Sequence, residues 1–336
     1  MKKYVVDLRS TDKNNTAQYK AKNDITDILS KKGYKVIPYY FSKFKMIKLF
    51  RVLYIVFRFK FINKGIVVYQ YPLGTKKVDT IFIHELKKNK SIKKISVIHD
   101  LESLRFNKNN SESLKKEIQL LNAFDGIVVH NDSMQQWLKK NGLKAPMSNI
   151  RVFDYLLDSK TINRNLKQKN NNIIFAGNLK KAGFLKKLNL KTSIDVFGPN
   201  PELNEYPHNI RYKGVVSSDV LVSKINEKFG LIWDGNSVSE CTGMYGNYEK
   251  FNTPHKLSLY LSSDTPVIAW KQAAISKFIE DNHVGITVTS LEELDKILSN
   301  ISDKDYNQLF NNTRIVGRKI RNGDYICKAI NELLQD

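Results

Sequence analysis

The sequence predicts two doubly wound α/β domains joined by a polar linker. A chain of 336 residues is too long for one typical compact domain and fits two domains of about 150 residues each. Each half opens with an apolar strand followed by a helix or a turn into one, at 4–32 and at 172–181. Strands that alternate with helices form parallel sheets, and such sheets bind ligands in the loops at the carboxyl ends of their strands.

The first predicted domain covers residues 1–157. Its strands are expected at 4–8, 35–39, 66–71, 95–98, 126–130 and 150–156, and its helices at 17–32, 111–122 and 133–140. The strands are short apolar runs that end at turn residues, which is typical of fully buried parallel strands. A linker rich in lysine and asparagine follows at about 158–171.

The second predicted domain covers residues 172–318, and residues 319–336 are expected to form a C-terminal helix. Strands are expected at 172–175, 193–197, 210–212, 229–233, 267–270 and 284–288, and helices at 273–281, 291–300 and from 303 onward. The connection at 236–251 is rich in glycine, serine and tyrosine, and its length indicates a functional loop.

The charge balance favours anionic partners. The chain has 55 lysines and arginines against 33 acidic residues, a net charge of +22, which attracts polyanions, anionic lipid or phosphorylated substrates. The cations are spread along the chain and no zinc-finger or RRM-like signature is present, which argues against nucleic acid. Cys241 and Cys327 are far apart and form no disulfide or zinc pattern, and Asp7 interrupts the apolar opening, so a cytoplasmic location is expected.

Residues 41–61, FSKFKMIKLFRVLYIVFRFKF, have an unusual composition. They contain six cations and no acid among many large apolar residues, and the longest uncharged run, 52–57, is too short to span a bilayer. One interpretation is a basic amphipathic helix on the inner face of an anionic membrane. The other is a buried or acceptor-facing helix of the first domain.

Residues 247–270 place a turn, a helix start and a buried strand in the order that a phosphate site needs. Asn252 or Thr253 can cap the helix, Pro254 suits its first position, and Lys256 falls in its first turn. A cation is unfavourable at that end of the helix dipole unless an anion lies there. The alternative is an ordinary helix and strand with a solvated Lys256.

Two crevice loops of the first domain carry candidate acceptor residues. His99 and Asp100 follow the strand at 95–98, where a carboxylate could act as general base towards an acceptor hydroxyl. Asp100 is the preferred base, with His99 and Glu102 as alternatives, and all three could instead only shape the loop. Asn15 and Thr16 lie in the loop after the first strand, where Thr16 could equally cap a helix.

The stretch PHKLSLYLSSDTPVIAWKQAAISKFIEDNHVGITV, at 254–288, resembles the nucleotide-sugar signature of bacterial GT-B glycosyltransferases. It is most similar to the small enzymes that add glucose to O-linked GlcNAc on serine-rich adhesins, and to related galactofuranosyltransferases. The resemblance extends from about residue 15 to residue 288. It implies two facing Rossmann-like domains, with a C-terminal helix that packs back on the first.

The resemblance also implies site residues. Thr16, with Asn15, matches a substrate contact, Lys180 after Asn178 matches a basic residue on the diphosphate, and Tyr212 matches a tyrosine near the nucleotide. Lysine replaces an expected arginine at 180, which keeps the charge but loses the bidentate fork. The nucleotide-binding set is Asn178, Lys180, Tyr212, Asn252, Thr253, Pro254, His255, Lys256 and Leu257.

The implied activity is transfer of a hexose, glucose or galactose, from a UDP-sugar to a glycan such as GlcNAc on a glycoprotein rich in serine and threonine. No cofactor or metal is expected. Retaining GT-B enzymes carry paired glutamates at a characteristic spacing, which Glu240 and Glu249 do not match, so inversion is favoured. Three alternatives stay open: a peripheral membrane protein, a nucleic-acid-binding protein, and a non-catalytic partner subunit. A homo-oligomer is also open.

Overall fold

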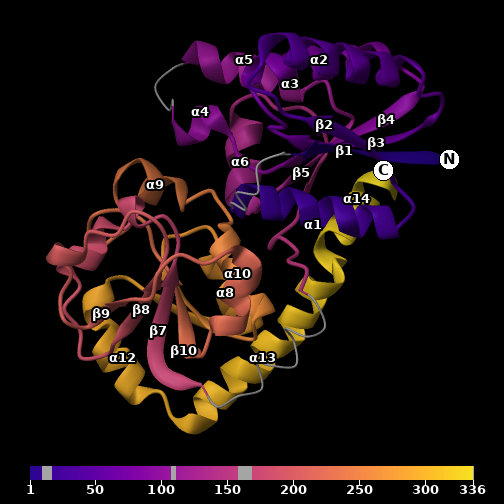
Figure 1. Cartoon of the computed structure of the whole chain (residues 1–336). Helices are drawn as coiled ribbons and strands as arrows, with labels where there is room; N and C mark the ends of the chain where they lie inside the picture. The colour runs from indigo at the N-terminus through magenta and orange to yellow at the C-terminus, as the bar shows by residue number, and fades with distance from the viewer. Residues whose placement is uncertain (10–16, 107–110, 158–168, 336) are drawn as a thin grey trace. The chain divides into compact units, whose positions relative to one another are not determined.

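The computed structural model describes residues 1–9, 17–106, 111–157 and 169–335 (Figure 1). The chain divides into two compact units, which are described separately. Unit 1 comprises Met1–Ile150 and Tyr325–Asp336, and unit 2 comprises Arg151–Asp324. Asn15, Thr16 and most of the predicted linker lie outside the described residues.

Unit 1 contains a parallel sheet of six strands in the order β2-β1-β3-β4-β5-β6. Every residue of β3 and all but one of β4 are buried or nearly so, which is why their apolar runs are continuous rather than alternating. The winding direction reverses between β1 and β3, the switch point where this topology binds ligands. The strands are β1 (Lys2–Arg9), β2 (Lys35–Tyr40), β3 (Gly65–Tyr71), β4 (Ile92–Ile98), β5 (Gly126–Val129) and β6 (Met147–Asn149).

Helices cover both faces of this sheet. Figure 1 shows α2, α3 and α5 on one face and α1 and α14 on the other. The helices of unit 1 are α1 (Ala17–Lys31), α2 (Lys45–Lys60), α3 (Lys76–Lys88), α4 (Glu102–Arg105), α5 (Ser111–Leu121), α6 (Asp132–Lys140) and α14 (Asp324–Gln335). Side chains from both helical layers meet the sheet, so the core of unit 1 lies on either side of β3 and β4.

The last helix belongs to the first α/β unit. In α14, Leu333 lies over Gly126 at the start of β5, and Ser148 of β6 donates a hydrogen bond to Glu332. Ile326, Ala329 and Ile330 on the same helix are buried. The expected return of a C-terminal helix to the first domain is therefore confirmed, and this helix begins at Asp324.

Unit 2 also contains a parallel sheet of six strands, in the order β12-β11-β10-β7-β8-β9. Its first strand in the chain, β7, lies in the middle beside β10, so the switch point falls between these two strands. The strands are β7 (Asn170–Ala176), β8 (Ile194–Phe197), β9 (Ile210–Tyr212), β10 (Glu227–Ile232), β11 (Val267–Trp270) and β12 (Gly285–Val288). Both sheets confirm the predicted class of two parallel α/β domains.

The connections of unit 2 are helices and short 3-10 turns. The α-helices are α8 (Ser218–Lys224), α9 (Gly243–Tyr248), α10 (His255–Ser262), α11 (Ser276–Asn282), α12 (Leu294–Asn300) and α13 (Asp303–Asn322). The 3-10 turns are η1 (Leu179–Lys181), η2 (Gly183–Lys187), η3 (Leu203–Glu205) and η4 (Leu291–Glu293). Gly323, at φ 79°, ends α13 in the left-handed conformation that glycine adopts without strain.

Several predicted elements differ from the structure. Residues 150–156 form no strand, although Val152, Phe153 and Tyr155 are buried, and the sheet ends at β6. The long loop at 236–251 contains the helix α9, and Pro254 is the N-cap of α10 rather than its first helical residue. A fixed φ near −65° suits either position, so the sequence does not distinguish them. The helices α3 and α8 had not been expected.

Candidate active site

The candidate donor site lies at the switch point of unit 2, where β7 and β10 end side by side. Lys256, in the first turn of α10, reaches this point with its ammonium group. Its Nζ donates to Asp234 Oδ1 at 2.7 Å, just past the end of β10, and lies 3.4 Å from the carbonyl oxygen of Trp233. The same ammonium lies 4.5 Å from the centre of the Phe175 ring on β7. A fixed cation therefore occupies the edge of the sheet where doubly wound folds bind ligands.

The structure gives Lys256 a partner from the chain itself. A lysine at a helix N-terminus is favourable only beside an anion or when solvated, and here the carboxylate of Asp234 supplies part of the negative charge. Both side chains are mostly buried, with 16% and 20% of their surfaces exposed. A phosphate group at this edge would share the lysine with Asp234, and it would also meet the N-terminal end of α10.

Close contact between α10 and the sheet depends on Gly230. A side chain at Gly230 on β10 would lie 2.3 Å from the ring of Tyr260, so only glycine lets α10 approach this closely. The Tyr260 hydroxyl in turn accepts a hydrogen bond of 2.9 Å from the N–H of Ala176 at the end of β7. This contact joins α10 to the strand beside the switch point and holds Lys256 there.

The loop after β7 carries two of the predicted residues. Asn178 caps η1, because its side chain accepts a hydrogen bond from the N–H of Lys180 at 3.2 Å. The same oxygen also accepts from Asn200 Nδ2 at 2.9 Å. Lys180 is exposed, so its ammonium is available to a ligand. The next cation, Lys181, lies 4.1 Å from the centre of the Tyr245 ring on α9. The loop thus presents Lys180 at the carboxyl edge while Asn178 shapes the turn.

Tyr212 supports the same loop from β9. Its hydroxyl donates to the carbonyl oxygen of Gly198 at 3.1 Å. Gly198 has φ 146°, and a side chain there would lie 1.7 Å from the carbonyl oxygen of Gly177. Gly177 also has little room, since its own side chain would lie 3.1 Å from Lys256 Cε. Tyr212 is therefore linked to Lys256 only indirectly: it contacts Gly198, Gly198 packs on Gly177, and Gly177 packs on Lys256.

The residues around the start of α10 have different environments. Thr253 is buried, and its hydroxyl lies 3.4 Å from the carbonyl oxygen of Arg151. His255 packs against Tyr155, with ring centres 5.2 Å apart. Leu257 is fully buried in the core. Asn252 and Pro254 are partly exposed at this end of the helix.

Glu249 completes a charged cluster with Asp234 and Lys256. Its side chain is almost fully buried, and burial raises the pKa of Glu249 to about 8, with Asp234 raising it further and Lys256 opposing the shift. A protonated Glu249 leaves Lys256 and Asp234 as a balanced pair. In the sequence, Glu249 stands out only through its spacing from Glu240, which gives no sign of this burial.

The raised pKa of Glu249 predicts a pH-dependent stability. The folded protein holds this proton up to about pH 8, whereas the unfolded chain loses it near its ordinary value of 4.5. Stability from this group is therefore fully present below pH 4.5 and is lost as pH rises towards 8. Glutamine does not titrate, so Glu249→Gln does not lose this stability. The melting temperature of the variant minus that of wild type should therefore increase from pH 5 to pH 8.

The matched control for this prediction is Glu240→Gln in the same segment, because the side chain of Glu240 is exposed. Its melting temperature relative to wild type should stay level over the same pH range. If the melting temperature of Glu249→Gln minus that of wild type also stays constant over this pH range, Glu249 is ionised in the folded protein.

The candidate acceptor residues of unit 1 follow β4. Asp100 Oδ2 accepts from Arg105 at 3.2 Å, and about a quarter of the Asp100 side chain is exposed. His99 is buried, and its Nε2 lies 3.0 Å from Gln70 Oε1. Glu102 is exposed at the first position of α4. Of the three, Asp100 combines a carboxylate, partial exposure and a fixed orientation.

Lys22 is a neighbour of Asp100 that sequence reasoning missed. It is fully buried on α1, and its ammonium donates to the carbonyl oxygen of Pro72, just past the end of β3. Burial lowers the pKa of Lys22 to about 8, while Asp79, Asp100 and Asp7 act against that shift. In the sequence, Lys22 looks like any solvated lysine on the surface of a helix, so nothing in the sequence predicts that it is buried. The carboxyl edge of unit 1 thus contains a buried cation close to the proposed base.

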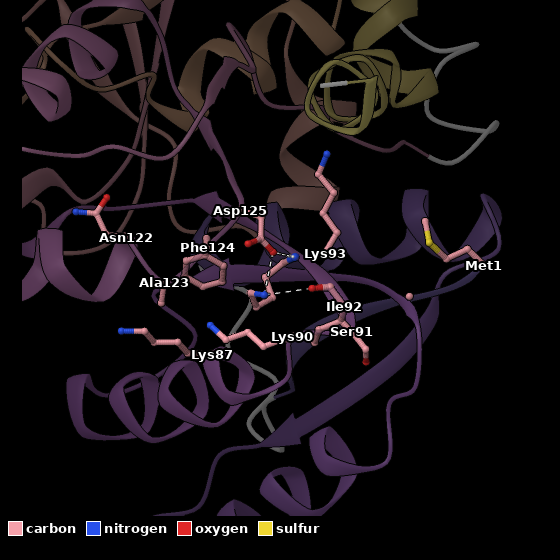
Figure 2. A pocket seen from close by; sticks show the side chains of 12 residues that line it. Met1, Lys87, Lys90, Ser91, Ile92, Lys93, Asn122, Ala123, Phe124 and Asp125 are labelled. Atoms are coloured by element: carbon pink, nitrogen blue, oxygen red, sulfur yellow. Dashed lines mark hydrogen bonds and ion pairs between the residues drawn. The ribbon is translucent and has the colours of Figure 1, made fainter.

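A basic cavity at the other edge of this sheet is a separate feature. It lies at the amino ends of β4 and β5 and has a volume of about 600 Å³. Figure 2 shows the side chains that line it. Lys87, Lys90 and Lys93 line it, and Lys94 Nζ already pairs with Asp125 at 2.9 Å. Ligands of doubly wound folds bind at the carboxyl ends of strands, so this cavity is not the candidate active site.

No group of three or more histidine, cysteine, aspartate or glutamate side chains within the described ranges could hold a metal ion. Within the same ranges, no helix is both long enough and apolar enough to cross a membrane.

Comparison with known proteins identifies relatives along the whole chain. Residues 2–152 match the family described as Glucosyltransferase 3-like, N-terminal domain, and residues 173–333 match the corresponding C-terminal domain. The chain is 34% identical over 280 residues to beta-1,6-galactofuranosyltransferase WbbI of Escherichia coli strain K12, covering 82% of this chain and 80% of that protein. It is 26% identical over 317 residues to glucosyltransferase 3 of Streptococcus gordonii, covering 92% of each.

Solved structures with the same fold are glycosyltransferases with the GT-B architecture. Trehalose-6-phosphate synthase OtsA aligns with a TM-score of 0.64 and 9% identity, covering 100% of this chain and 99% of that one. Sucrose-phosphate synthase from Thermosynechococcus elongatus aligns with a TM-score of 0.60 and 11% identity, covering 99% and 98%. At these identities the likeness shows the fold alone, and it confirms the GT-B class predicted from the resemblance.

Proposed function

Because the chain belongs to the glucosyltransferase 3-like family of glycosyltransferases, we propose that it transfers a hexose from a UDP-sugar to a glycan acceptor. The sugar is glucose or galactose, and the acceptor is a residue such as GlcNAc on a glycoprotein rich in serine and threonine. The names of the two relatives support both sugars, since one is a glucosyltransferase and the other a galactofuranosyltransferase. Transfer proceeds without a metal and inverts the anomeric centre.

The donor half of the reaction is assigned to unit 2. Lys256 Nζ, held 2.7 Å from Asp234 at the switch point, is the observation that carries this assignment. The ammonium, the N-terminal end of α10 and Lys180 would neutralise the charge that develops on the diphosphate as its bond to the sugar breaks. Asn178 and Tyr212 shape the loop that presents Lys180, and the segment Asn252–Leu257 presents Lys256.

The acceptor half is assigned to unit 1. Asp100 takes the proton of the acceptor hydroxyl while that oxygen forms a bond to the anomeric carbon, and UDP leaves with the electrons of the broken bond. Arg105 orients the carboxylate through the contact at 3.2 Å. Thr16 and Asn15, which follow β1 in the sequence, are proposed to contact the acceptor together with His99 and Glu102.

A donor screen followed by turnover tests this proposal. The full chain is heated with UDP, GDP or dTDP, and UDP is expected to raise the melting temperature most. A ligand at ~100 times its dissociation constant adds ~2.7 kcal/mol to the free energy of unfolding, which is large enough to detect. UDP-glucose, UDP-galactose and UDP-galactofuranose are then offered with a GlcNAc-terminated glycopeptide. We expect release of UDP at a rate unchanged by EDTA, and a β-linked product by proton NMR from the α-linked pyranose donors.

The possible outcomes separate the proposal from its alternatives. Stabilisation by UDP without sugar transfer to any acceptor would indicate a non-catalytic partner subunit. Absence of any nucleotide effect, together with binding to DNA or vesicles, would contradict the donor site. A product with retained stereochemistry, or loss of activity with EDTA, would overturn those parts of the mechanism alone.

A further inference from the structure

The outer face of α2 is apolar although it is exposed. Only Val52, Ile55 and Phe59 of this helix are buried, and they form one narrow stripe against the rest of unit 1, where Phe59 packs on Phe82 of α3. The opposite side carries Met46, Phe50, Leu53 and Phe57, which recur at spacings of four, three and four residues and so share one face. Their exposed fractions are 65%, 65%, 53% and 58%.

This apolar face continues beyond the four central residues. Ile47, Leu49, Tyr54 and Phe61 are also exposed beside it, and Phe44 is exposed at the N-cap of the helix. Monomeric soluble proteins rarely expose so many large apolar side chains together, and a contiguous patch of this kind marks an interaction surface. The expectation of a buried helix at 41–61 is corrected for this face, since Leu53 lies outside the core, while the acceptor-facing alternative stays a prediction.

Cations border the apolar face on both sides. By helical geometry, Lys45 and Lys60 lie along one border, and Arg51 and Arg58 lie along the other. Arg51 is held by the carbonyl oxygens of Tyr40 and Phe41 at 3.1 and 3.0 Å, and Arg58 by the Tyr54 hydroxyl at 2.9 Å. These contacts orient both guanidinium groups without neutralising either charge.

These charges have no carboxylate partner in the part of the chain that the structure describes. Residues 41–61 contain six cations and no acid, and none of the six forms an ion pair with another described residue. A second copy of the chain placed on this face would bring like charges together, which costs several kcal/mol. The face therefore requires a partner that is apolar in the middle and anionic at its borders.

We propose that α2 binds the surface of an anionic lipid bilayer. The helix lies in the plane of the membrane with Phe50, Leu53 and Phe57 among the acyl chains and the flanking cations at the level of the phosphate groups. This inference concerns a surface of unit 1 and does not depend on the identity of the sugar donor. It places the acceptor-binding unit at the membrane surface.

Flotation of the full chain with vesicles tests the proposal. Wild type should float with vesicles that contain phosphatidylglycerol, and not with pure phosphatidylcholine, at ~0.01 M salt, where the Debye length is ~30 Å. At ~1 M salt, where it is ~3 Å, binding should be much weaker. Lys43→Gln/Lys45→Gln/Lys60→Gln should weaken binding by about a hundredfold, because each cation contributes roughly fivefold.

A charge-matched control keeps the test specific. Lys87→Gln/Lys90→Gln/Lys93→Gln removes the same charge from the cavity of Figure 2, which has no comparable apolar face, and should bind vesicles nearly as wild type does. Phe50→Ser/Leu53→Ser/Phe57→Ser should lose binding at both salt concentrations while melting near the wild-type temperature, because these side chains are mostly exposed.

Three results would overturn the proposal. The first is absence of flotation with anionic vesicles at low salt. The second is an equal loss in the control variant, which would indicate attraction by net charge alone. The third is a wild-type oligomer, seen by light scattering, that becomes monomeric in the triple serine variant, since a second copy would then cover this face.

Discussion

Replacing Lys256 by alanine is expected to weaken UDP binding by at least about thirtyfold. The ammonium is a mostly buried cation in a fixed hydrogen bond, and loss of one such partner costs ~2–5 kcal/mol. The variant also leaves Asp234 facing the diphosphate without its counter-charge. Isothermal titration with UDP measures the change directly.

The control is Lys250→Ala, a nearby exposed lysine whose ammonium lies 5.3 Å from the centre of the Trp270 ring. It removes the same charge from unit 2 and should leave UDP affinity within about twofold of wild type. A second variant, Lys256→Ala/Asp234→Asn, tests whether the loss comes from the unpaired carboxylate. UDP affinity that is unchanged in Lys256→Ala would remove the donor site from this position.

Changing Asp100 to asparagine is expected to lower kcat by about 10²- to 10⁴-fold, the usual contribution of a general base. Asparagine has the same shape, and its carbonyl oxygen can still accept from Arg105, so the loop after β4 should be unchanged. UDP affinity should be unaffected, because the donor residues belong to unit 2. Steady-state kinetics and titration together separate these effects.

Glu102→Gln tests the alternative base, since Glu102 is exposed on the adjacent helix α4. A strong loss of turnover in this variant, with near-normal turnover in Asp100→Asn, would move the role of base to Glu102. If both variants are active, His99 is the remaining candidate in this loop.

The sheets could be predicted from sequence because their strands are buried on both faces. The runs around Val67, Val97 and Ile268 are continuously apolar, and each ends at a turn or polar residue that marks a loop. Residues 150–156 show the limit of this argument. Val152, Phe153 and Tyr155 are as buried as strand residues, yet these three residues, which follow β6, form no strand. An apolar run in the sequence predicts that a segment contacts the core, but it does not predict that the segment forms a strand hydrogen-bonded to a neighbouring strand.

The candidate donor site could be predicted in part. The position of Lys256 at a helix start points to an anion site, whereas Asp234 becomes part of the site only in the structure. Their direct contact could not be predicted, because it depends on how closely α10 approaches β10 over Gly230. Glu249 and Lys22 gave no signal, since charged residues are usually solvated and only the packed structure shows that both are buried.

The position of α14 affects how the protein folds during synthesis. The helix completes unit 1, but in the chain it follows all of unit 2. On the ribosome, unit 2 can therefore fold while unit 1 still lacks the side chains of Ile326, Ile330 and Leu333, which together with α1 cover one side of its sheet. Until α14 emerges, the first unit to be translated exposes apolar surface around Gly126, so the two units reach their final form in the reverse of their order of synthesis.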